Sequence, residues 1–364
     1  MTRVTFWIVM LAIAGTMLLG YFIVKRRTEE RLWSVGFKNY AGTVPGFRCR
    51  YRRLGQPQQR VWIFKNSGLP IKTWVECREK IEAALNITII QVAYCGGKRY
   101  VRVTALPGNV RLPGYLAWKE DLLSSEDFEL VLGESLLGRV TINLSNPPHL
   151  MLGGCSGSGK SALLKLLLMQ SLHKGAEVYI ADFKGGVDFP REWWDCCRII
   201  TEKAELLSCL SSIDEEMERR RHLLAAYGCT KIEEYNARAE QKLPRIIVAC
   251  DEVTDILDKR GLLKDERFLT EQLESKISRL ARQGRAFGIH LVLATQRPDA
   301  DLISGQIRSN LGYRICGQAD EILSKIVLEN TVAAEQISPD DRGRFVLRDT
   351  VFQAYWMDDS QLEN

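Results

Sequence analysis

Eight consecutive residues constrain the fold of this chain more than any other feature: Gly154, Cys155, Ser156, Gly157, Ser158, Gly159, Lys160 and Ser161. Two glycines bracket four residues and are followed by Lys and Ser, which is the pattern of a phosphate-binding loop. The glycines let successive N–H groups point at the phosphates of a nucleotide, Lys160 can reach the β- and γ-phosphates, and Ser161 can bind Mg²⁺. An apolar run at 149–152 precedes the loop and an apolar helix pattern follows it, as this loop requires. The sequence therefore predicts a bound nucleoside triphosphate with Mg²⁺.

A second chemical site is predicted at the end of a later apolar run. Residues 245–250 end in Asp251 and Glu252. Asp251 is placed to join the Mg²⁺ shell, and Glu252 to polarise an attacking water. The run 289–295 ends in Gln296, a candidate for sensing the γ-phosphate or orienting water. Strands that end in acidic residues also occur without catalytic roles, but the phosphate loop upstream favours a hydrolytic site.

Basic residues are concentrated in the first third of the chain. The 364 residues carry a net charge of +5, yet residues 25–119 hold 19 Lys and Arg against 5 Asp and Glu. The run Phe47–Arg52 alternates with the period of a strand, which predicts Arg48, Arg50 and Arg52 on one face. Two explanations remain open. The face is either solvated and attracted to anionic lipid headgroups, or it is a track for nucleic-acid phosphates.

The cysteines and histidines indicate a reduced chain without a dedicated metal site. None of the ten cysteines forms a C-x-x-C pair, Cys196 and Cys197 are adjacent, and Cys250 and Cys316 lie within apolar runs. This usage is typical of small core residues in a reducing cytoplasm rather than of a disulfide framework. The four histidines show no metal-ligand spacing, so no metal beyond Mg²⁺ is predicted.

An uncharged segment near the N-terminus has the length of a membrane span. Thr5 to Val24 is twenty residues without charge, about what a helix needs to cross a bilayer. A cleaved signal peptide is the alternative, but the apolar stretch is longer than a usual signal core and no Ala-x-Ala site follows it. Lys25, Arg26 and Arg27 follow the segment, against Arg3 alone before it, which predicts a cytoplasmic C-terminal part. We expect a single-pass anchor in the cell membrane.

The pattern along the chain predicts three parts: an N-terminal transmembrane anchor at 1–27, a small basic α+β module at 28–118 and an α/β domain at 119–364. In the last part strands alternate with helices, which is typical of a mainly parallel sheet covered on both faces. Its expected strands are 150–153, 177–182, 246–250, 289–295 and 313–317, its main helices 203–226 and 231–240, and a closing pair of strands falls within 344–357. The module is expected to contain strands at 60–65, 87–94 and 99–105 and a helix at 71–85.

Several motifs together resemble the FtsK/SpoIIIE family of DNA-pumping ATPases. They are Asp182-Phe183-Lys184-Gly185-Gly186, the helix around 216–220, Glu234-Tyr235-Asn236, the strand ending in Asp251-Glu252, and the runs 285–298 and 307–310. The resemblance covers roughly residues 128–357, and the run 285–298 is its most specific part. It implies a RecA-like P-loop NTPase core that binds ATP, assembles as a hexameric ring and moves double-stranded DNA through the central channel.

The resemblance also implies a role for an arginine. In such rings an arginine of the neighbouring subunit completes each nucleotide site, and Arg285 matches that family position best. There it would stabilise charge that develops on the γ-phosphate. Arg279, Arg282 and Arg314 are weaker candidates, for which a surface or structural role is the alternative.

Other positions are singled out by the same resemblance. Arg297 and Arg308 fall in a DNA-facing loop of the family and are candidate contacts to phosphates of any sequence. Asp182 and Lys184 match a motif near the nucleotide, but the resemblance assigns them no individual role. Cys155 stands where Ala or Pro is more usual, and because this position contributes backbone it should not prevent nucleotide binding.

The expected build of one membrane pass, no long linker and no C-terminal reader domain resembles the coupling ATPases of Gram-positive conjugative elements. It implies a membrane-anchored, ATP-dependent DNA translocase that delivers DNA to a conjugative channel, with a relaxase and mating-channel proteins as partners. Two alternatives remain. One is a chromosome-partitioning translocase without a reader domain. The other is a protein-secretion ATPase like those of type VII systems, which usually join several such domains in one chain.

Overall fold

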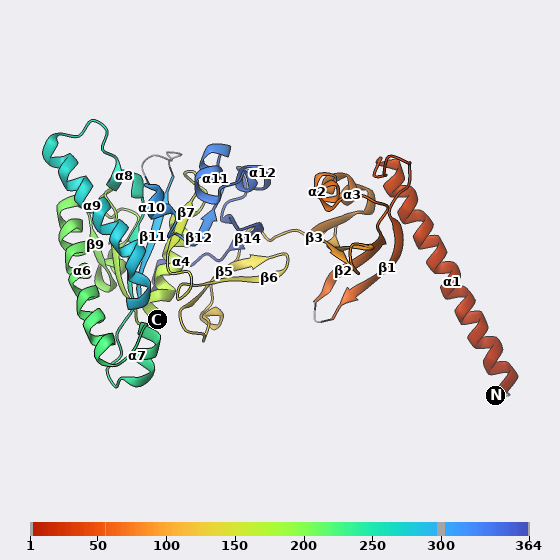
Figure 1. Cartoon of the computed structure of the whole chain (residues 1–364), viewed down its shortest axis with the longest axis horizontal. Helices are drawn as coiled ribbons and strands as arrows, with labels where there is room; N and C mark the ends of the chain where they lie inside the picture. The colour runs from red at the N-terminus through yellow and green to blue at the C-terminus, as the bar shows by residue number, and fades with distance from the viewer. Residues whose placement is uncertain (1–2, 55, 297–302, 363–364) are drawn as a thin grey trace. The chain divides into compact units, whose positions relative to one another are not determined.

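The computed structural model describes residues 3–54, 56–296 and 303–362 (Figure 1). Contacts divide the chain into two compact units, Met1–Arg111 and Leu112–Asn364, called here the N-terminal and the C-terminal unit. Each unit has a hydrophobic core of its own. The first helix runs past residue 27 to Ser34 and contributes to the core of the N-terminal unit; the predicted bounds of the parts stay a prediction.

The N-terminal unit is a four-stranded antiparallel sheet packed against helices. Its elements are α1 (Arg3–Ser34), β1 (Gly46–Arg53), β2 (Gln56–Lys65), α2 (Ile71–Glu76), α3 (Arg78–Leu85), β3 (Ile87–Cys95) and β4 (Tyr100–Pro107). The strands lie in the order β1-β2-β4-β3. Phe64 and Val103 of the sheet are fully buried with Trp74 of α2 and Leu32 of α1. Burial of these large apolar side chains is the main stabilising contribution to the unit.

The helix predicted over 71–85 is interrupted by one residue. Cys77 has φ −93° and ψ 13°, which ends α2 and begins α3. Arg78 and Glu82 of α3 both bond the backbone of Ile89 in β3; the Ile89 amide donates to Glu82 Oε1 at 2.6 Å. These contacts with a neighbouring strand fix α3 independently of α2, so tertiary packing overrides the continuous helical pattern of the sequence.

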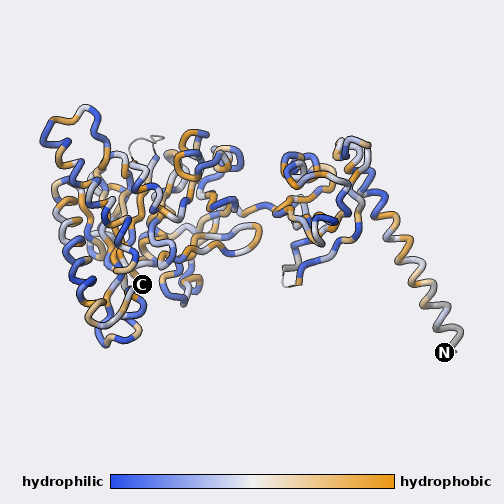
Figure 2. The backbone as a smooth tube through the Cα atoms, viewed as in Figure 1, coloured by the Kyte–Doolittle hydropathy of each residue, from blue (hydrophilic) through white to orange (hydrophobic). Residues whose placement is uncertain are grey.

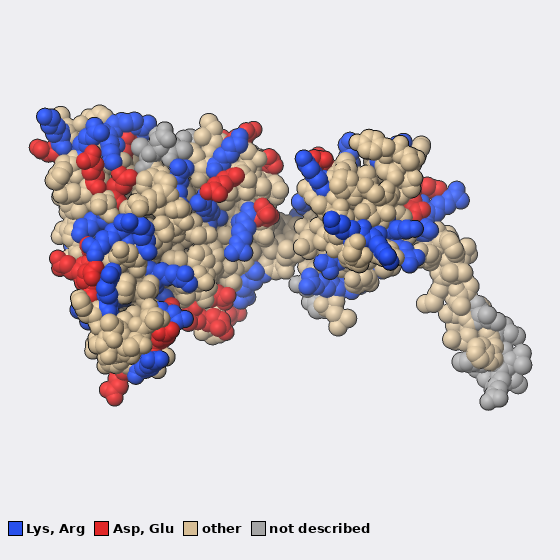
Figure 3. Space-filling model, viewed as in Figure 1, with Lys and Arg blue, Asp and Glu red and all other residues tan. Residues whose placement is uncertain are grey.

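The alternating pattern predicts that the arginines of β1 share one face of the sheet, but in the structure they do not. A register shift makes Arg48 an extra, bulged residue in the pairing of β1 with β2. Arg48 lies over the ring of Tyr100, whereas Arg50 lies over the ring of Trp62 on the opposite face of the sheet. The four strands together carry seven Lys and Arg and no Asp or Glu, and basic side chains form a band across this unit in Figure 3. Both explanations for the basic character stay open.

Helix α1 contains the segment that the sequence predicts to cross a membrane. Within the described ranges, no helix combines the length and the apolar character that a membrane span requires. The predicted span from Thr5 to Val24 is therefore not confirmed. The C-terminal part of α1 packs on the sheet, where Leu32 is fully buried and Glu29 accepts a hydrogen bond from the Phe47 amide at 2.9 Å.

The C-terminal unit is built on a ten-stranded sheet in which the six consecutive strands of one side are parallel (Figure 1). In spatial order these are β12 (Tyr313–Cys316), β7 (Leu150–Gly153), β11 (Ile289–Thr295), β10 (Ile246–Cys250), β8 (Glu177–Ala181) and β9 (Arg198–Ile200). Every residue of β7, β10 and β11 is buried, as expected of parallel strands covered on both faces. The predicted α/β class with a mainly parallel sheet is confirmed, and the five expected strands lie within about one residue of their predicted bounds.

Four antiparallel strands extend this sheet beyond β12: β13 (Arg344–Leu347), β14 (Thr350–Ala354), β5 (Glu129–Ser135) and β6 (Gly138–Asn143). The sequence predicts the pair β13–β14, but β5, β6 and β9 are not among the expected strands. Gly133 allows β5 to approach β14 closely, because a Cβ there would lie 1.9 Å from the Gln353 carbonyl oxygen.

Helices cover both faces of the sheet. They are α4 (Lys160–His173), α5 (Arg191–Cys196), α6 (Lys203–Ala226), α7 (Ile232–Arg238), α8 (Val253–Leu257), α9 (Lys264–Gln283), α10 (Gly305–Arg308), α11 (Glu321–Leu328) and α12 (Val332–Gln336), with short 3₁₀ turns η1 (Glu120–Leu122), η2 (Gly284–Phe287) and η3 (Asp359–Leu362). Helices α4 and α5 pack on one face, and α6, α8, α9 and α11 on the other. Figure 2 shows the central strands as mainly hydrophobic. Both faces of the strands are thus used for packing, and polar chemistry is left to the strand ends.

Candidate nucleotide-binding and hydrolysis site

The phosphate-loop residues lie at the carboxyl edge of the parallel strands, between β7 and α4. The Cys155 amide is used within the fold, where it donates to the Gln318 carbonyl at 2.8 Å. Other amides of the loop, among them those of Gly157, Gly159 and Lys160, donate to no acceptor within the described part of the chain. Free amides at the start of a helix are the groups that bind phosphate oxygens.

Gly159 fixes the conformation of this loop. It precedes α4 with φ 96°, a left-handed conformation that favours glycine. A Cβ at this position would lie 3.1 Å from the amide nitrogen and Cα of Gly343. The Gly343 amide also donates to the Ser158 carbonyl at 2.9 Å. The segment before β13 therefore braces the loop, and a larger residue at 159 would disturb both.

Asp251 gathers the cations of the site around its buried carboxylate. It accepts hydrogen bonds from Lys160 Nζ at 2.8 Å and from Lys184 Nζ at 3.0 Å, and Ser161 Oγ lies 3.4 Å from its Oδ1. Burial alone would raise the pKa of Asp251, but the ammonium groups of Lys160 and Lys184 outweigh it and hold this pKa below its usual range. The ionised carboxylate of Asp251 can therefore serve as an oxygen ligand for a cation, next to the hydroxyl of Ser161.

Glu252 is buried and held by three donors. Thr295 Oγ1 donates to its Oε1 at 2.8 Å, the Gln296 amide donates to Oε2 at 2.8 Å, and Thr254 Oγ1 also donates to Oε1. The carboxylate is thus oriented at the ends of β10 and β11. The structure places the backbone of Gln296, rather than its side chain, on Glu252. Thr295 could have been found as a polar residue at a strand end, whereas nothing in the sequence marks Thr254.

Arg285 lies at the opposite, amino edge of the sheet. It belongs to η2, which leads into β11, and Gln296 follows the far end of that strand. The seven residues of β11, at a rise of about 3.3 Å each, separate the two edges by roughly 20 Å. Arg285 therefore cannot contact the phosphate loop of its own chain.

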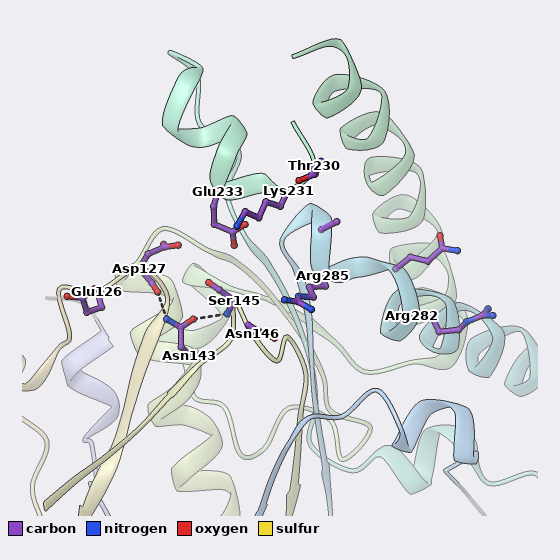
Figure 4. A pocket seen from close by; sticks show the side chains of 12 residues that line it. Glu126, Asp127, Asn143, Ser145, Asn146, Thr230, Lys231, Glu233, Arg282 and Arg285 are labelled. Carbon is purple, nitrogen blue, oxygen red and sulfur yellow. Dashed lines mark hydrogen bonds between the residues drawn. The ribbon is translucent and has the colours of Figure 1, made fainter. Parts of the chain in front are cut away.

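Arg285 lines a pocket of about 650 Å³ at this amino edge (Figure 4). Its side chain points toward Asn146, whereas that of Arg282 points away from Asn146. Within the described residues Arg285 forms no ion pair, while the acidic residues Asp127 and Glu233 of the pocket are each paired with Arg245 at 2.8 Å. Arg285, like Lys231 and Arg282 of the same pocket, forms no ion pair within the described residues, so its guanidinium group is available to an anionic group of another molecule.

Comparisons with known proteins agree with this arrangement. The profile of the FtsK/SpoIIIE family matches residues 123–300. DNA translocase FtsK of Helicobacter pylori strain J99 is 31% identical over 233 residues, which is 60% of this chain and 26% of that protein. The conjugation coupling protein TcpA of pCW3, solved as a monomer with ATPγS, is 33% identical with a TM-score of 0.69, over 93% of this chain and 96% of that chain. This chain belongs to the FtsK/SpoIIIE family. Its C-terminal unit is a P-loop ATPase domain of that family, as the sequence resemblance predicts.

One more solved structure agrees in fold. EssC of Geobacillus thermodenitrificans, ATPases 2 and 3, has a TM-score of 0.58 at 20% identity, over 70% of this chain and 51% of that chain. Identity this low supports a shared fold and nothing further. The match spans about a quarter of the length of the FtsK proteins of Helicobacter pylori.

Two of the three weaker arginine candidates of this FtsK/SpoIIIE chain form ion pairs, whereas the side chain of Arg282, within the described residues, donates only to the Ser278 carbonyl at 3.3 Å. Arg279 pairs with Asp214 at 2.9 Å and with Glu218. Arg314 pairs with Glu329 at 2.6 Å. The guanidinium groups of Arg279 and Arg314 therefore link elements within the chain. This agrees with the structural role that the sequence analysis gave as the alternative.

The two candidate DNA contacts are less defined. Arg308 ends α10, is half-buried, and its carbonyl accepts a hydrogen bond from Arg314 Nη2 at 3.0 Å. Arg297 lies outside the described residues. A role of either residue in DNA binding stays a prediction.

The residues at the carboxyl edge fit ATP with Mg²⁺. The free loop amides and Lys160 would hold phosphate oxygens. Asp251 and Ser161 present oxygen atoms of the kind that Mg²⁺ takes from proteins, usually one or two with substrate phosphates completing the shell. Glu252 lies next to Asp251 and is oriented for proton transfer.

Proposed function

We propose that this protein is a membrane-anchored, ATP-dependent DNA translocase that couples DNA to a conjugative transfer channel. The observation that carries the proposal is the placement of the catalytic groups. Lys160, Asp251 and Glu252 lie at one edge of the sheet and Arg285 at the other. A second copy is therefore needed to complete each site, as in a ring motor. Support for DNA as the cargo comes from the FtsK relatives and from the coupling protein TcpA, most of whose length this chain matches.

In the proposed reaction each residue has a separate task. Lys160 exchanges its contact with Asp251 for the phosphates of ATP. Asp251 and Ser161 would hold Mg²⁺, which when bound would neutralise negative charge on the phosphates. Glu252 accepts the proton of the attacking water. Arg285 of the neighbouring copy stabilises charge that develops on the γ-phosphate.

The proposed assembly is a head-to-tail ring, which we take to be hexameric. Because the phosphate loop and Arg285 lie on opposite edges, one copy's carboxyl edge meets the next copy's amino edge. Heterologous contacts of this kind generate closed rings when the rotation closes. Cations facing the channel, with Arg297 and Arg308 as candidates, would bind phosphates of any DNA sequence.

The proposal predicts that double-stranded DNA stimulates ATP hydrolysis by the full chain several-fold, independently of DNA sequence. Phosphate release is measured with and without DNA at low and high salt. Stimulation should weaken as salt rises, because phosphate contacts release counterions. Lys160→Ala should abolish both rates. Absence of stimulation at low salt, or stimulation that persists in Lys160→Ala, would contradict the proposal.

Membrane attachment is proposed through the first part of α1. Support comes from its uncharged sequence and from apolar side chains that the described residues leave more than half exposed, namely Met17, Leu18, Leu19 and Phe22. The full chain should float with lipid vesicles in a density gradient, whereas a Leu18→Arg, Leu19→Arg variant should stay with the soluble fraction. Equal flotation of both proteins would contradict attachment through α1.

The conjugative role, with a relaxase and mating-channel proteins as partners, is supported by the likeness to TcpA. No observation on this chain favours a chromosome-partitioning role over it. The likeness to EssC is one of fold, so it gives no separate support to protein secretion.

A further inference from the structure

Two acidic residues follow neighbouring parallel strands at the centre of the site. Ala181 of β8 and Cys250 of β10 are register partners, so Asp182 and Asp251 are the next residues on strands about 4.8 Å apart. The Asp251 amide donates to the Ala181 carbonyl at 3.1 Å, which continues the pairing past the strand ends. The exposed fractions of Asp182 and Asp251 are 1% and 0%. Two buried carboxylates at this separation repel each other unless a cation is close.

One oxygen of Asp182 has no hydrogen-bond partner. Its Oδ1 accepts from the Lys184 amide at 3.0 Å, but its Oδ2 is buried and accepts from no group in the described part of the chain. Burial, with a smaller contribution from the charge of Asp251, raises the pKa of Asp182. A buried oxygen without a donor is costly to a fold. Its retention here is explained if the oxygen faces a cation that binds with the nucleotide.

The side chain of Lys184 supplies positive charge to the same pair of carboxylates. Its Nζ donates to Asp251 Oδ2 at 3.0 Å, while Lys160 takes Oδ1. The Lys184 side chain is 42% exposed, in contrast with 3% for Lys160. Since it lies on the loop after β8 and is partly solvated, its ammonium group can exchange Asp251 for water at small cost.

We propose that Asp182 and Lys184 set the Mg²⁺ affinity of the nucleotide site: Asp182 attracts the ion through its free Oδ2, and Lys184 competes with the ion for Asp251. The inference rests on the proposed nucleotide site and is independent of DNA translocation. Removing the charge of Asp182 and removing that of Lys184 should shift one measured quantity in opposite directions. This distinguishes the inference from a purely structural role of the two residues. That quantity is the ratio of the ADP dissociation constants measured in EDTA and in Mg²⁺, which reports the coupling of metal to nucleotide.

The first test removes the charge of Asp182. Asp182→Asn keeps the Oδ1 acceptor for the Lys184 amide, and its affinity for fluorescent mant-ADP is measured in EDTA and in MgCl₂ with the full chain. We expect the ratio to fall about three- to tenfold from that of the wild type, because one of two negative charges facing the ion is lost. Asp188→Asn is the matched control. Asp188 is close enough to act on the charges of Asp182 and Lys184 but forms no contact with Asp251, so its ratio should stay near that of the wild type.

The second test removes the competing cation. Lys184→Met keeps most of the aliphatic stem, and its ratio should rise about threefold or more because Mg²⁺ no longer displaces an ammonium group from Asp251. Thermal unfolding of this variant should also show a larger stabilisation by Mg²⁺ with ADP than in the wild type. Lys325→Met is the control, since Lys325 likewise pairs with a carboxylate, that of Glu321 at 3.2 Å, but away from the site.

Shifts of opposite sign in Asp182→Asn and Lys184→Met support the inference. Ratios that equal the wild type in both variants, or that move in the same direction, would overturn it. A purely structural role weakens ADP binding in EDTA and in Mg²⁺ alike and leaves the ratio unchanged. If ADP binding shows the expected shifts while DNA fails to stimulate hydrolysis, the translocase proposal fails and this inference stands.

Discussion

Replacing Arg285 with Ala is expected to lower ATP hydrolysis by about three orders of magnitude or more while leaving ATP binding intact, because an arginine supplied in trans is worth about 10³–10⁵ in rate. The physical reason is distance. Arg285 and the phosphate loop are separated by the length of β11, so in the proposed ring the guanidinium group would act on a neighbouring copy's nucleotide. Hydrolysis is measured by phosphate release with DNA present, and binding by mant-ATP fluorescence.

Mixing two inactive variants tests that this effect operates between copies. Arg285→Ala retains its phosphate loop and Lys160→Ala retains its Arg285, so an interface between them has one complete site. Mixed after separate purification, they should regain activity that neither has alone. The control is Arg282→Ala, which removes a neighbouring arginine that points away from Asn146 (Figure 4) and should stay near wild-type activity. Failure of the mixture to regain activity would contradict a trans role for Arg285.

Glu252→Gln is expected to lower ATP hydrolysis about 10²- to 10⁴-fold, the usual contribution of a general base. The amide is nearly isosteric. Its oxygen can keep the hydrogen bond from the Gln296 amide, while its NH₂ group donates to the hydroxyl oxygens of Thr254 or Thr295, so the geometry at the strand ends persists. What is lost is the basic oxygen that takes the proton of water.

Nucleotide binding separates this effect from damage to the site. The Glu252→Gln variant should bind ATP with Mg²⁺ as well as the wild type and should accumulate ATP-bound protein, seen as unhydrolysed nucleotide retained on gel filtration. Hydrolysis within a fewfold of the wild type would show that Glu252 is not the base. Loss of ATP binding would show that it is part of the binding site instead.

Most of the parallel strands, and the candidate site residues at their ends, were predictable from the sequence because buried parallel strands are short, uninterrupted apolar runs. The run 246–250 is followed by Asp251 and the run 150–153 by Gly154. The same stretch of sequence therefore predicts both the end of a strand and the functional residue that follows it. The loop residues, Asp251 and Glu252 then follow from residue types alone. Their distances do not, because the sequence carries no direct record of which strands are neighbours.

The contacts that required the structure are those set by strand order or by local irregularity. Asp182 lies beside Asp251 only because β8 lies beside β10, so the sequence resemblance placed its motif near the nucleotide but assigned Asp182 no individual role. The remoteness of Arg285 from its own loop depends on the direction of β11. The prediction that Arg48 shares a face with Arg50 was wrong because a period-two pattern assumes regular strand pairing. A single bulged residue moves the side chains on either side of it to opposite faces of the sheet.

Release of a third strand from a DNA triplex is the most direct test of the central claim that this chain moves along DNA. The full chain is supplied with ATP on a duplex that carries a triplex-forming strand at one end, and release of the labelled strand is followed in time. We predict release that requires ATP and is absent with Lys160→Ala and Glu252→Gln. ATP hydrolysis at the full DNA-stimulated rate without release of the third strand would contradict the claim.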